Sequence, residues 1–240
     1  MSGSAPEPWL SVVIPVFDEA GNLEALHREL SSVLDGLREP AEILFVDDGS
    51  RDASPVLLAR LAAGDPRVRL VTLDRNHGQS AALDAGFRRA RGEVVATLDA
   101  DLQNDPADLP RLLALLDRAD VVNGVRATRR DGWVRKLSSR IGNGFRNWMT
   151  GESVTDVGCS LRVMRAEPLS RVKMFRGMHR FLPTLLRMEG ARVIEVPVAH
   201  RPRLAGSSKY GIANRLFTGL HDVLAVRWMQ RRALRYRVKE

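Results

Sequence analysis

The sequence predicts an α/β fold, a doubly wound and mainly parallel sheet flanked by helices. Two observations lead to this prediction. Short apolar segments of strand length alternate with amphipathic segments of helix length as far as residue 125, which is typical of parallel sheets. Polar motifs also follow the ends of the apolar segments, and sheets of this class bind ligands at the carboxyl ends of their strands.

The expected strands are short apolar runs at residues 10–16, 43–46, 68–73, 94–98 and 121–125. Between them we expect helices over residues 20–35, 54–63, 77–91 and 106–118. Apolar residues from Leu23 to Leu34 recur at helical spacing on one face. Ser54 is the expected N-cap of its helix because Pro55 follows at the first helical position, and Gly92 is expected to end the helix over 77–91.

The segment after the fourth strand carries the most informative residues. In an extended backbone Asp99, Asp101 and Gln103 would project to the same side. Two carboxylates and an amide oxygen suit Mg²⁺ or Mn²⁺, which proteins hold with one or two carboxylates plus substrate phosphates. A pair of solvated loop acids is the alternative. The neighbouring polar motifs at strand ends favour a metal site.

Composition narrows the class of protein. The chain is 44% hydrophobic and 28% charged, as expected for a soluble globular protein. Its single cysteine, Cys159, excludes an internal disulfide and suits a reducing compartment. No apolar run approaches the roughly 18 residues that span a bilayer, and the N-terminus lacks a signal-peptide pattern. We therefore expect a protein on the cytoplasmic side of the membrane.

Positive charge is concentrated in two regions. Residues 201–240 hold ten Lys or Arg and two acidic residues, which equals the net charge of +8 of the whole chain. A second cluster of arginines and one lysine lies between residues 126 and 146. Such clusters suit nucleic acid, anionic lipid or a phosphorylated substrate. Nucleic acid is the least favoured, because no helix-turn-helix, zinc-finger or aromatic RNA-binding pattern accompanies them.

Several ordered motifs resemble those of a known family. They read VVIPVFDEAGNL, ILFVDDGSRDAS, RNHGQSAALDAGF and TLDADLQNDP. They resemble the family 2 glycosyltransferases of GT-A fold, in the polyprenyl-phosphate subgroup typified by dolichyl-phosphate mannose synthase. The resemblance covers roughly residues 10–210. It implies an enzyme that uses a GDP- or UDP-linked sugar.

The resemblance implies a pocket for the base and ribose, lined by Pro15, Phe17, Glu19, Asp47 and Asp48. For Asp48 a purely structural turn with Gly49 is an equal alternative.

The same resemblance assigns the metal to Asp99, Asp101 and Gln103, with Asp99 also contacting the nucleotide sugar.

Further roles concern phosphate groups. Arg126 and Arg140 resemble the arginines that grip the acceptor phosphate, for which a guanidinium offers paired hydrogen bonds. Arg203 and Lys209 match a loop whose cations close over the diphosphate. With Asp101, these four residues form the expected catalytic set.

The implied reaction is an inverting, metal-dependent transfer of a sugar to undecaprenyl or dolichyl phosphate. A lipid phosphate is largely anionic near neutral pH and needs no protein base. One alternative is a hydroxyl acceptor, for which Asp156 is the candidate base; Asp156 otherwise positions sugar hydroxyls or forms a structural turn. A second alternative is a nucleotide-sugar-binding subunit without turnover. His77 is expected near the nucleotide sugar, whereas the sequence does not assign His179 or His200.

We expect a catalytic domain over residues 1–210 that includes an amphipathic helix at about 133–150, followed by a basic amphipathic helix and tail over 211–240. The apolar faces of both helices fit packing against the protein's own core or binding in the plane of an anionic membrane. We expect a peripheral enzyme at the cytoplasmic membrane face. A homodimer or a separate small membrane-anchor protein is a possible partner.

Overall fold

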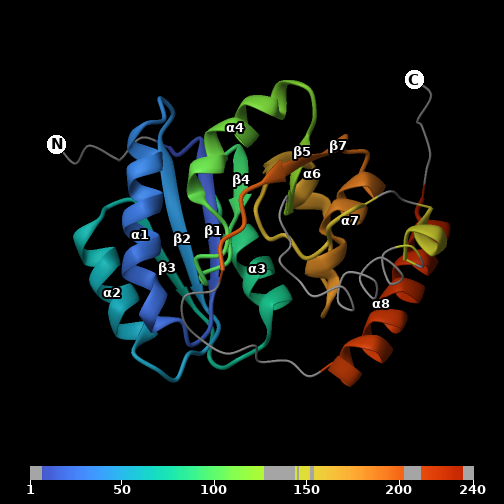
Figure 1. Ribbon diagram of the computed structural model, residues 1–240, viewed down its shortest axis with the longest axis horizontal. Helices are drawn as coiled ribbons and strands as arrows, with labels where there is room; N and C mark the ends of the chain where they lie inside the picture. The colour runs from blue at the N-terminus through green and yellow to red at the C-terminus, as the bar shows by residue number, and fades with distance from the viewer. Residues whose placement is uncertain (1–6, 127–143, 145, 152–153, 203–211, 235–240) are drawn as a thin grey trace. The chain divides into compact units, whose positions relative to one another are not determined.

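A computed structural model describes residues 7–126, 144, 146–151, 154–202 and 212–234, with side chains of the last segment described from residue 219. The chain divides into two compact units, and Figure 1 labels their helices and strands. One comprises Met1–Arg129 and Asp156–Ser207, and the other Arg130–Thr155 and Ser208–Glu240.

The first unit contains a seven-stranded sheet in the order β3-β2-β1-β4-β6-β5-β7. Its strands are β1 (Leu10–Val16), β2 (Ala41–Asp47), β3 (Val68–Thr72), β4 (Val94–Thr97), β5 (Val121–Arg126), β6 (Arg162–Arg165) and β7 (Val193–Val198). β6 runs antiparallel to both β4 and β5, and the other neighbours are parallel. The predicted mainly parallel α/β sheet is confirmed.

The helical elements are α1 (Ala20–Asp35), α2 (Ser54–Gly64), α3 (Gln79–Phe87), η1 (Pro106–Asp108), α4 (Leu109–Leu113), η2 (Ala114–Asp117), α6 (Ala166–Arg171), η3 (Met178–Phe181), α7 (Leu182–Met188) and α8 (Ile212–Arg232). Predicted boundaries differ most from the observed ones in two places. α3 is shorter than 77–91. The segment 106–118 is a short α-helix between two 3₁₀ turns, where Pro106 and Pro110 cannot donate backbone hydrogen bonds.

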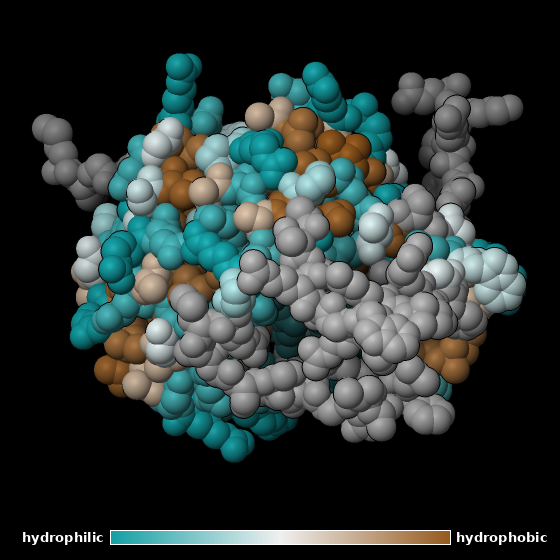
Figure 2. Space-filling view, viewed as in Figure 1, coloured by the Kyte–Doolittle hydropathy of each residue, from teal (hydrophilic) through white to brown (hydrophobic). Residues whose placement is uncertain are grey.

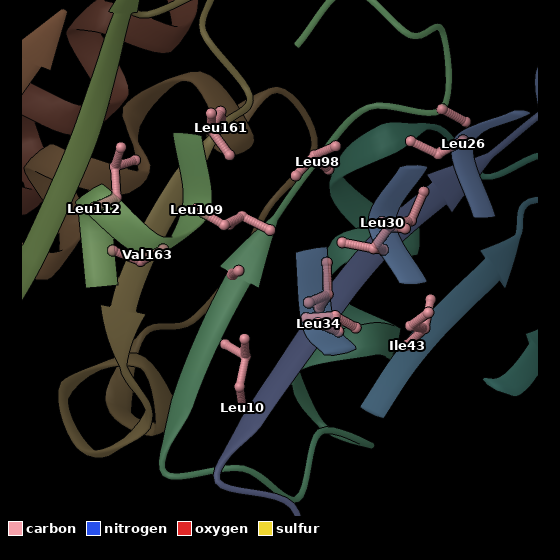
Figure 3. Packing of buried hydrophobic residues seen from close by; sticks show 14 of the residues in the cluster. Leu10, Leu26, Leu30, Leu34, Ile43, Leu98, Leu109, Leu112, Leu161 and Val163 are labelled. Carbon is pink, nitrogen blue, oxygen red and sulfur yellow. The ribbon is translucent and has the colours of Figure 1, made fainter. Parts of the chain in front are cut away.

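Side chains of β1 alternate between the two faces of the sheet, and a helix packs against each face. Val12 and Ile14 belong to the main apolar cluster with Leu26 and Leu30 of α1. Figure 3 shows this packing of α1 leucines over the strands. Val13 points to the other face, where a Cβ at Gly86 of α3 would lie only 2.3 Å from a Val13 methyl carbon. α3 therefore packs closely on the face opposite α1, as a doubly wound sheet requires.

On the face that Figure 2 shows, hydrophilic side chains predominate among the described residues, and apolar side chains gather in a few patches. Some exposed apolar surface is normal for a folded domain. The buried side chains concentrate in the cluster that runs from α1 across the sheet to Leu109 and Leu112 of α4 (Figure 3). Burial of each large apolar side chain contributes about 1.5–3 kcal/mol. This core fixes the strand ends that carry the polar motifs.

In the second unit, α8 is linked to the helical residues 146–150, since Gln230 Nε2 donates to the Thr150 carbonyl oxygen at 3.0 Å. Val223 and Val226 of α8 are buried, whereas Leu220, Leu224 and Trp228 are 43%, 48% and 63% exposed. No helix among the described residues is long and apolar enough to cross a bilayer.

Candidate functional site

Loops at the carboxyl ends of β1 and β2 are bonded to each other. Asp18 has a positive φ of 52°. Its N–H donates to Ser50 Oγ at 3.0 Å, and its carboxylate accepts from the Arg51 N–H at 2.7 Å. Ser54 was expected to cap its own helix. Its hydroxyl instead accepts the Glu19 N–H at 3.0 Å, and Ala53 occupies the cap position.

The expected base and ribose residues lie at this edge of the sheet. Pro15, Phe17 and Glu19 are partly exposed at or just past the end of β1, while Asp47 and Asp48 are buried. They come from two adjacent parallel strands, so the structure brings them to one edge.

Asp48 anchors a neighbouring loop. Its carboxylate accepts hydrogen bonds from Asn76 Nδ2 at 2.8 Å and from the N–H groups of His77 and Gly78 at 2.7 and 2.8 Å. Gly49 has a φ of 71°, and a Cβ there would lie 2.5 Å from the Arg75 carbonyl carbon. These contacts favour the structural alternative for Asp48, and its nucleotide-binding role stays a prediction.

The loop anchored by Asp48 leads into α3, whose first residue contacts Asp99, one of the candidate metal ligands. Gln79 Nε2 donates to Asp99 Oδ1 at 2.8 Å. The His77 ring lies 2.7 Å from Asp74 Oδ1, on the exposed side of the loop. Its expected proximity to a nucleotide sugar stays a prediction.

The backbone between Asp99 and Gln103 is a turn, so the expected extended alternation was wrong. β4 ends at Thr97, and Leu102 has a positive φ of 59°. Such a conformation costs of order 1 kcal/mol for a non-glycine residue and persists where packing enforces it; Leu102 is buried. The turn still brings Asp101 next to Gln103, whose N–H donates to Asp101 Oδ1 at 3.2 Å.

This arrangement fits a metal held jointly by protein and substrate. Within the described segments, no group of three or more His, Cys, Asp or Glu side chains is placed to hold an ion by itself. Asp99 and Asp101 would offer carboxylates to such an ion, and Gln103 would offer an amide oxygen. Mg²⁺ in particular is commonly bound by one or two carboxylates, with phosphates and waters completing its coordination.

His200 and Arg201, which follow β7, lie beside this turn. Asn104 and His200 form an antiparallel bridge, and the Arg201 N–H donates to the Gln103 carbonyl oxygen at 2.8 Å. The side chain of Gln103 lies 3.5 Å from His200 Nε2. His200, which the sequence left unassigned, therefore lies at the candidate metal site. Arg140, Arg203 and Lys209 fall outside the described residues.

The partly exposed Arg126 and the buried Asp156 form an ion pair that the sequence did not connect. Arg126 Nε and Nη2 donate to the two Asp156 oxygens at 2.7 and 2.8 Å. The Gly158 N–H adds a bond to Asp156 Oδ1 at 3.1 Å. A Cβ at Gly158 would lie 2.6 Å from Arg126 Nη2. The carboxylate and the glycine together define the orientation of the guanidinium.

Arg162 is a functional candidate that sequence reasoning missed. Its guanidinium is buried and donates to Asn123 Oδ1 at 2.8 Å and to the carbonyl oxygens of Cys159 and His179 at 2.7 and 3.0 Å. Burial lowers its pKa, which the charges of Asp99 and Asp156 oppose. The available signal was an arginine between the apolar residues Leu161, Val163 and Met164.

Cys159 is 1% exposed, and burial raises its pKa to about 11. A thiol with this pKa stays protonated near neutral pH and is a poor nucleophile. The expectation of a small buried hydrophobe is confirmed.

Sequence comparisons identify close relatives. The family model described as "Glycosyl transferase family 2" matches residues 11–173. Undecaprenyl-phosphate 4-deoxy-4-formamido-L-arabinose transferase of Edwardsiella ictaluri is 41% identical over 219 residues, covering 90% of this chain and 67% of the relative. Dodecaprenyl-phosphate galacturonate synthase of Rhizobium johnstonii is 38% identical over 228 residues, covering 92% and 67%. The chain spans about two thirds of the length of these relatives.

Solved structures share the fold. Glucosyl-3-phosphoglycerate synthase of Mycobacterium tuberculosis, in complex with Mn²⁺, UDP and glucosyl-3-phosphoglycerate, superposes with a TM-score of 0.66 at 18% identity, covering 93% of this chain and 80% of that one. A mannosyltransferase of Pyrobaculum calidifontis with GDP-Man and Mn²⁺ gives a TM-score of 0.65 at 22% identity, covering 94% and 64%. The GT-A fold expected from the motifs is confirmed.

Proposed function

This chain belongs to glycosyl transferase family 2, and from that premise we propose that it transfers a sugar from a nucleotide-diphosphate sugar to polyprenyl phosphate. The observation that carries the proposal is the identity of about 40% to polyprenyl-phosphate sugar transferases over some nine tenths of the chain. Undecaprenyl phosphate is the acceptor that we favour, because several of these relatives carry it in their names.

We assign the nucleotide to the edge formed by β1 and β2, with Pro15, Phe17, Glu19 and Asp47 around the base and ribose. Asp48 acts there by holding the loop from Asn76 to Gly78 in place.

We assign a divalent metal to Asp99, Asp101 and Gln103. When bound, Mg²⁺ or Mn²⁺ would neutralise charge on the departing nucleoside diphosphate. Gln79 orients Asp99 through its hydrogen bond, and the turn at Leu102 keeps Gln103 next to Asp101.

The acceptor phosphate is assigned to Arg126, together with Arg140. Direct attack by a phosphate oxygen on the anomeric carbon inverts its configuration and requires no protein base. A hydroxyl acceptor would require one, and Asp156 is poorly suited to that role. Its oxygens accept hydrogen bonds from the Arg126 side chain and from the N–H groups of Arg126 and Gly158. This arrangement favours the lipid phosphate over a hydroxyl.

Arg203 and Lys209 are proposed to close over the diphosphate. We propose further that the enzyme is peripheral on the cytoplasmic face of an anionic membrane. Leu220, Leu224 and Trp228 share one side of α8 by their four-residue spacing and are exposed. Arg227, Arg231 and Arg232 on the same helix supply positive charge. A homodimer or a small membrane-anchor protein remains part of this proposal.

The decisive experiment is a radiolabelled transfer assay with purified protein, Mg²⁺ or Mn²⁺, a panel of UDP- and GDP-sugars, and undecaprenyl phosphate in detergent. We expect label in the lipid phase, and its loss in Asp101→Ala or with EDTA. Label in a hydroxyl acceptor instead would contradict the lipid-phosphate assignment. Metal-dependent binding of a nucleotide sugar without transfer to either acceptor would support the non-enzymatic subunit.

A further inference from the structure

His179 and Ser80 make a contact that no part of the proposed reaction uses. His179 lies in η3 and Ser80 in the first turn of α3, 99 positions apart in the chain. His179 Nδ1 lies 2.7 Å from Ser80 Oγ. Ser80 is buried, whereas His179 is partly exposed. The contact therefore places one edge of an imidazole against α3 and leaves the ring partly accessible to solvent.

Counting hydrogens at Ser80 assigns the tautomer of His179. Ser80 Oγ accepts the N–H of Gly177 at 3.0 Å and that of His179 at 3.5 Å. A hydroxyl has two acceptor lone pairs and one hydrogen. With both lone pairs used, the hydroxyl hydrogen is directed to His179 Nδ1. Nδ1 is then the acceptor, and the proton of a neutral imidazole must sit on Nε2.

The His179 ring is neutral throughout the physiological pH range. Burial, together with the positive charges of Arg180 and Arg162, lowers the pKa of His179 to about 3. A histidine with such a pKa is a very weak base near pH 7. What it can offer a ligand is a neutral N–H donor in a fixed orientation.

Two connections tie His179 to elements that flank the candidate metal site. Ser80 directly follows Gln79, which donates to Asp99. The His179 carbonyl oxygen accepts from Arg162 Nη1, and Arg162 pairs in the sheet with Thr97, two residues before Asp99. The ring and the backbone of His179 are thus each tied to an element that flanks Asp99.

We propose that His179 Nε2–H donates a hydrogen bond to the sugar of the nucleotide sugar and thereby helps to determine which sugar is accepted. This inference rests on the proposed function. It assigns the ligand chemistry to a sugar oxygen, because a neutral donor suits a hydroxyl or carbonyl oxygen, whereas the diphosphate is met by the metal and by cations. Ser80 acts as a positioning residue through the tautomer that it enforces.

The test compares the affinity for a nucleotide sugar with the affinity for its nucleoside diphosphate. Binding of UDP, GDP, UDP-glucose, UDP-N-acetylglucosamine and GDP-mannose is measured by calorimetry with the full chain and Mn²⁺. His179→Phe is expected to weaken binding of the accepted nucleotide sugar about five- to tenfold, as for loss of one hydrogen bond, with its nucleoside diphosphate unaffected. His179→Gln, which can place an amide N–H near the position of Nε2, is expected within about threefold of wild type. His27→Phe, at a histidine on α1 bonded to Asp65, is the control and should bind as wild type.

A spectroscopic measurement on the wild-type chain does not depend on any variant folding. Long-range ¹H–¹⁵N correlation of histidine rings should show His179 protonated at Nε2 and unprotonated at Nδ1 from pH 5 to 8. Its Nε2 resonance should shift with the nucleotide sugar and not with the nucleoside diphosphate alone.

Three results would overturn the inference. One is a tautomer protonated at Nδ1, and another is a His179→Phe chain that binds the nucleotide sugar as wild type does. A third is an equal loss of nucleotide sugar and nucleoside diphosphate affinity in His179→Phe, which would indicate a structural role alone. In each case a wild-type chain that still transfers sugar leaves the proposed function standing. A wild-type chain that binds none of the five nucleotides overturns both.

Discussion

The two halves of the sheet hold their loops by opposite chemistry. At the ends of β1 and β2, carboxylates accept backbone N–H groups: Asp47 from Ser50, Asp48 from His77 and Gly78, and Asp52 from Ala20 and Ser54. Around β5 and β6, guanidinium groups donate instead. Arg162 and Arg165 bind the carbonyl oxygens of Cys159, His179 and Leu116, and Arg126 binds Asp156.

The difference follows from chain direction. Each parallel strand in the first half is followed by a helix, and helix N-termini leave N–H groups without partners inside the helix. Carboxylates satisfy these groups and interact favourably with the positive end of the helix. β6 enters the sheet antiparallel after an irregular segment, and a carbonyl oxygen of that segment (Cys159) and carbonyl oxygens of the 3₁₀ turns η2 (Leu116) and η3 (His179) accept from arginines. One arginine offers five N–H donors. Arg126 ends β5, and Arg162 pairs with Thr97 at the end of β4, so their positive charge lies at the edge of the sheet that carries the candidate site and suits a phosphate. Arg165 pairs with Val94, toward the opposite edge.

The largest effect should come from Arg162, the least exposed cation among the described residues. Arg162→Met leaves the acceptors on Asn123, Cys159 and His179 without their partner, and we expect a loss of about 3–5 kcal/mol in the free energy of unfolding. Urea denaturation measures it. Arg165→Met, in the same strand but with a half-exposed side chain, is the control and should cost far less. Equal losses in both variants would contradict the special role of Arg162.

At the ends of β1 and β2, Asp48→Ala removes the acceptor for three N–H groups. Because water can reach part of this loop, we expect a smaller loss of about 2–3 kcal/mol in the free energy of unfolding. Hydrogen exchange should rise at the amides of His77 and Gly78. Asp117→Ala, at an exposed site on η2, is the matched control. Unchanged protection of the His77 and Gly78 amides in Asp48→Ala would contradict the anchoring role of Asp48.

A methyl group at Gly158 tests the Arg126–Asp156 pair without changing a charge. Gly158→Ala places a Cβ 2.6 Å from Arg126 Nη2, so the guanidinium must move. We expect transfer to polyprenyl phosphate to fall about tenfold, equivalent to about 1.4 kcal/mol, mainly through a higher KM for the lipid. Gly64→Ala, where a Cβ meets nothing within 4 Å, should retain full activity. An unchanged lipid KM would count against Arg126 as the phosphate ligand.

The smallest effect concerns acid stability in the first half. Burial of Asp65 opposes its ionisation, yet hydrogen bonds from Arg67 and His27 lower its pKa to about 2. The folded pKa lies below the unfolded value, so this stabilisation is present above pH of about 4 and is lost as pH falls from there toward 2. Partial exposure of Arg67 limits it to about 1 kcal/mol. Asp65→Asn should flatten the unfolding free energy over that pH window and leave its slope elsewhere unchanged; an unaltered slope would contradict the assignment.

Local sequence patterns were sufficient to predict the first half of the fold. Periodicity, Pro and Gly signals predicted β1 through β5 and α1 in order, because each parallel strand and its crossover helix form from adjacent residues. β6 and β7 were not predicted. β6 is only four residues long, and its place between β4 and β5 depends on partners more than 35 residues away.

The sequence by itself also determined which residue types gather at the strand ends, since the carboxyl ends of adjacent parallel strands meet at one edge. It could not determine how those side chains are used. Only the tertiary structure decided that Asp48 anchors a loop, that Asp156 orients Arg126 and that Ser80 fixes the tautomer of His179. Hydrogen bonds of this kind join residues about 30 to 99 positions apart, and a linear pattern does not specify which donor reaches which acceptor.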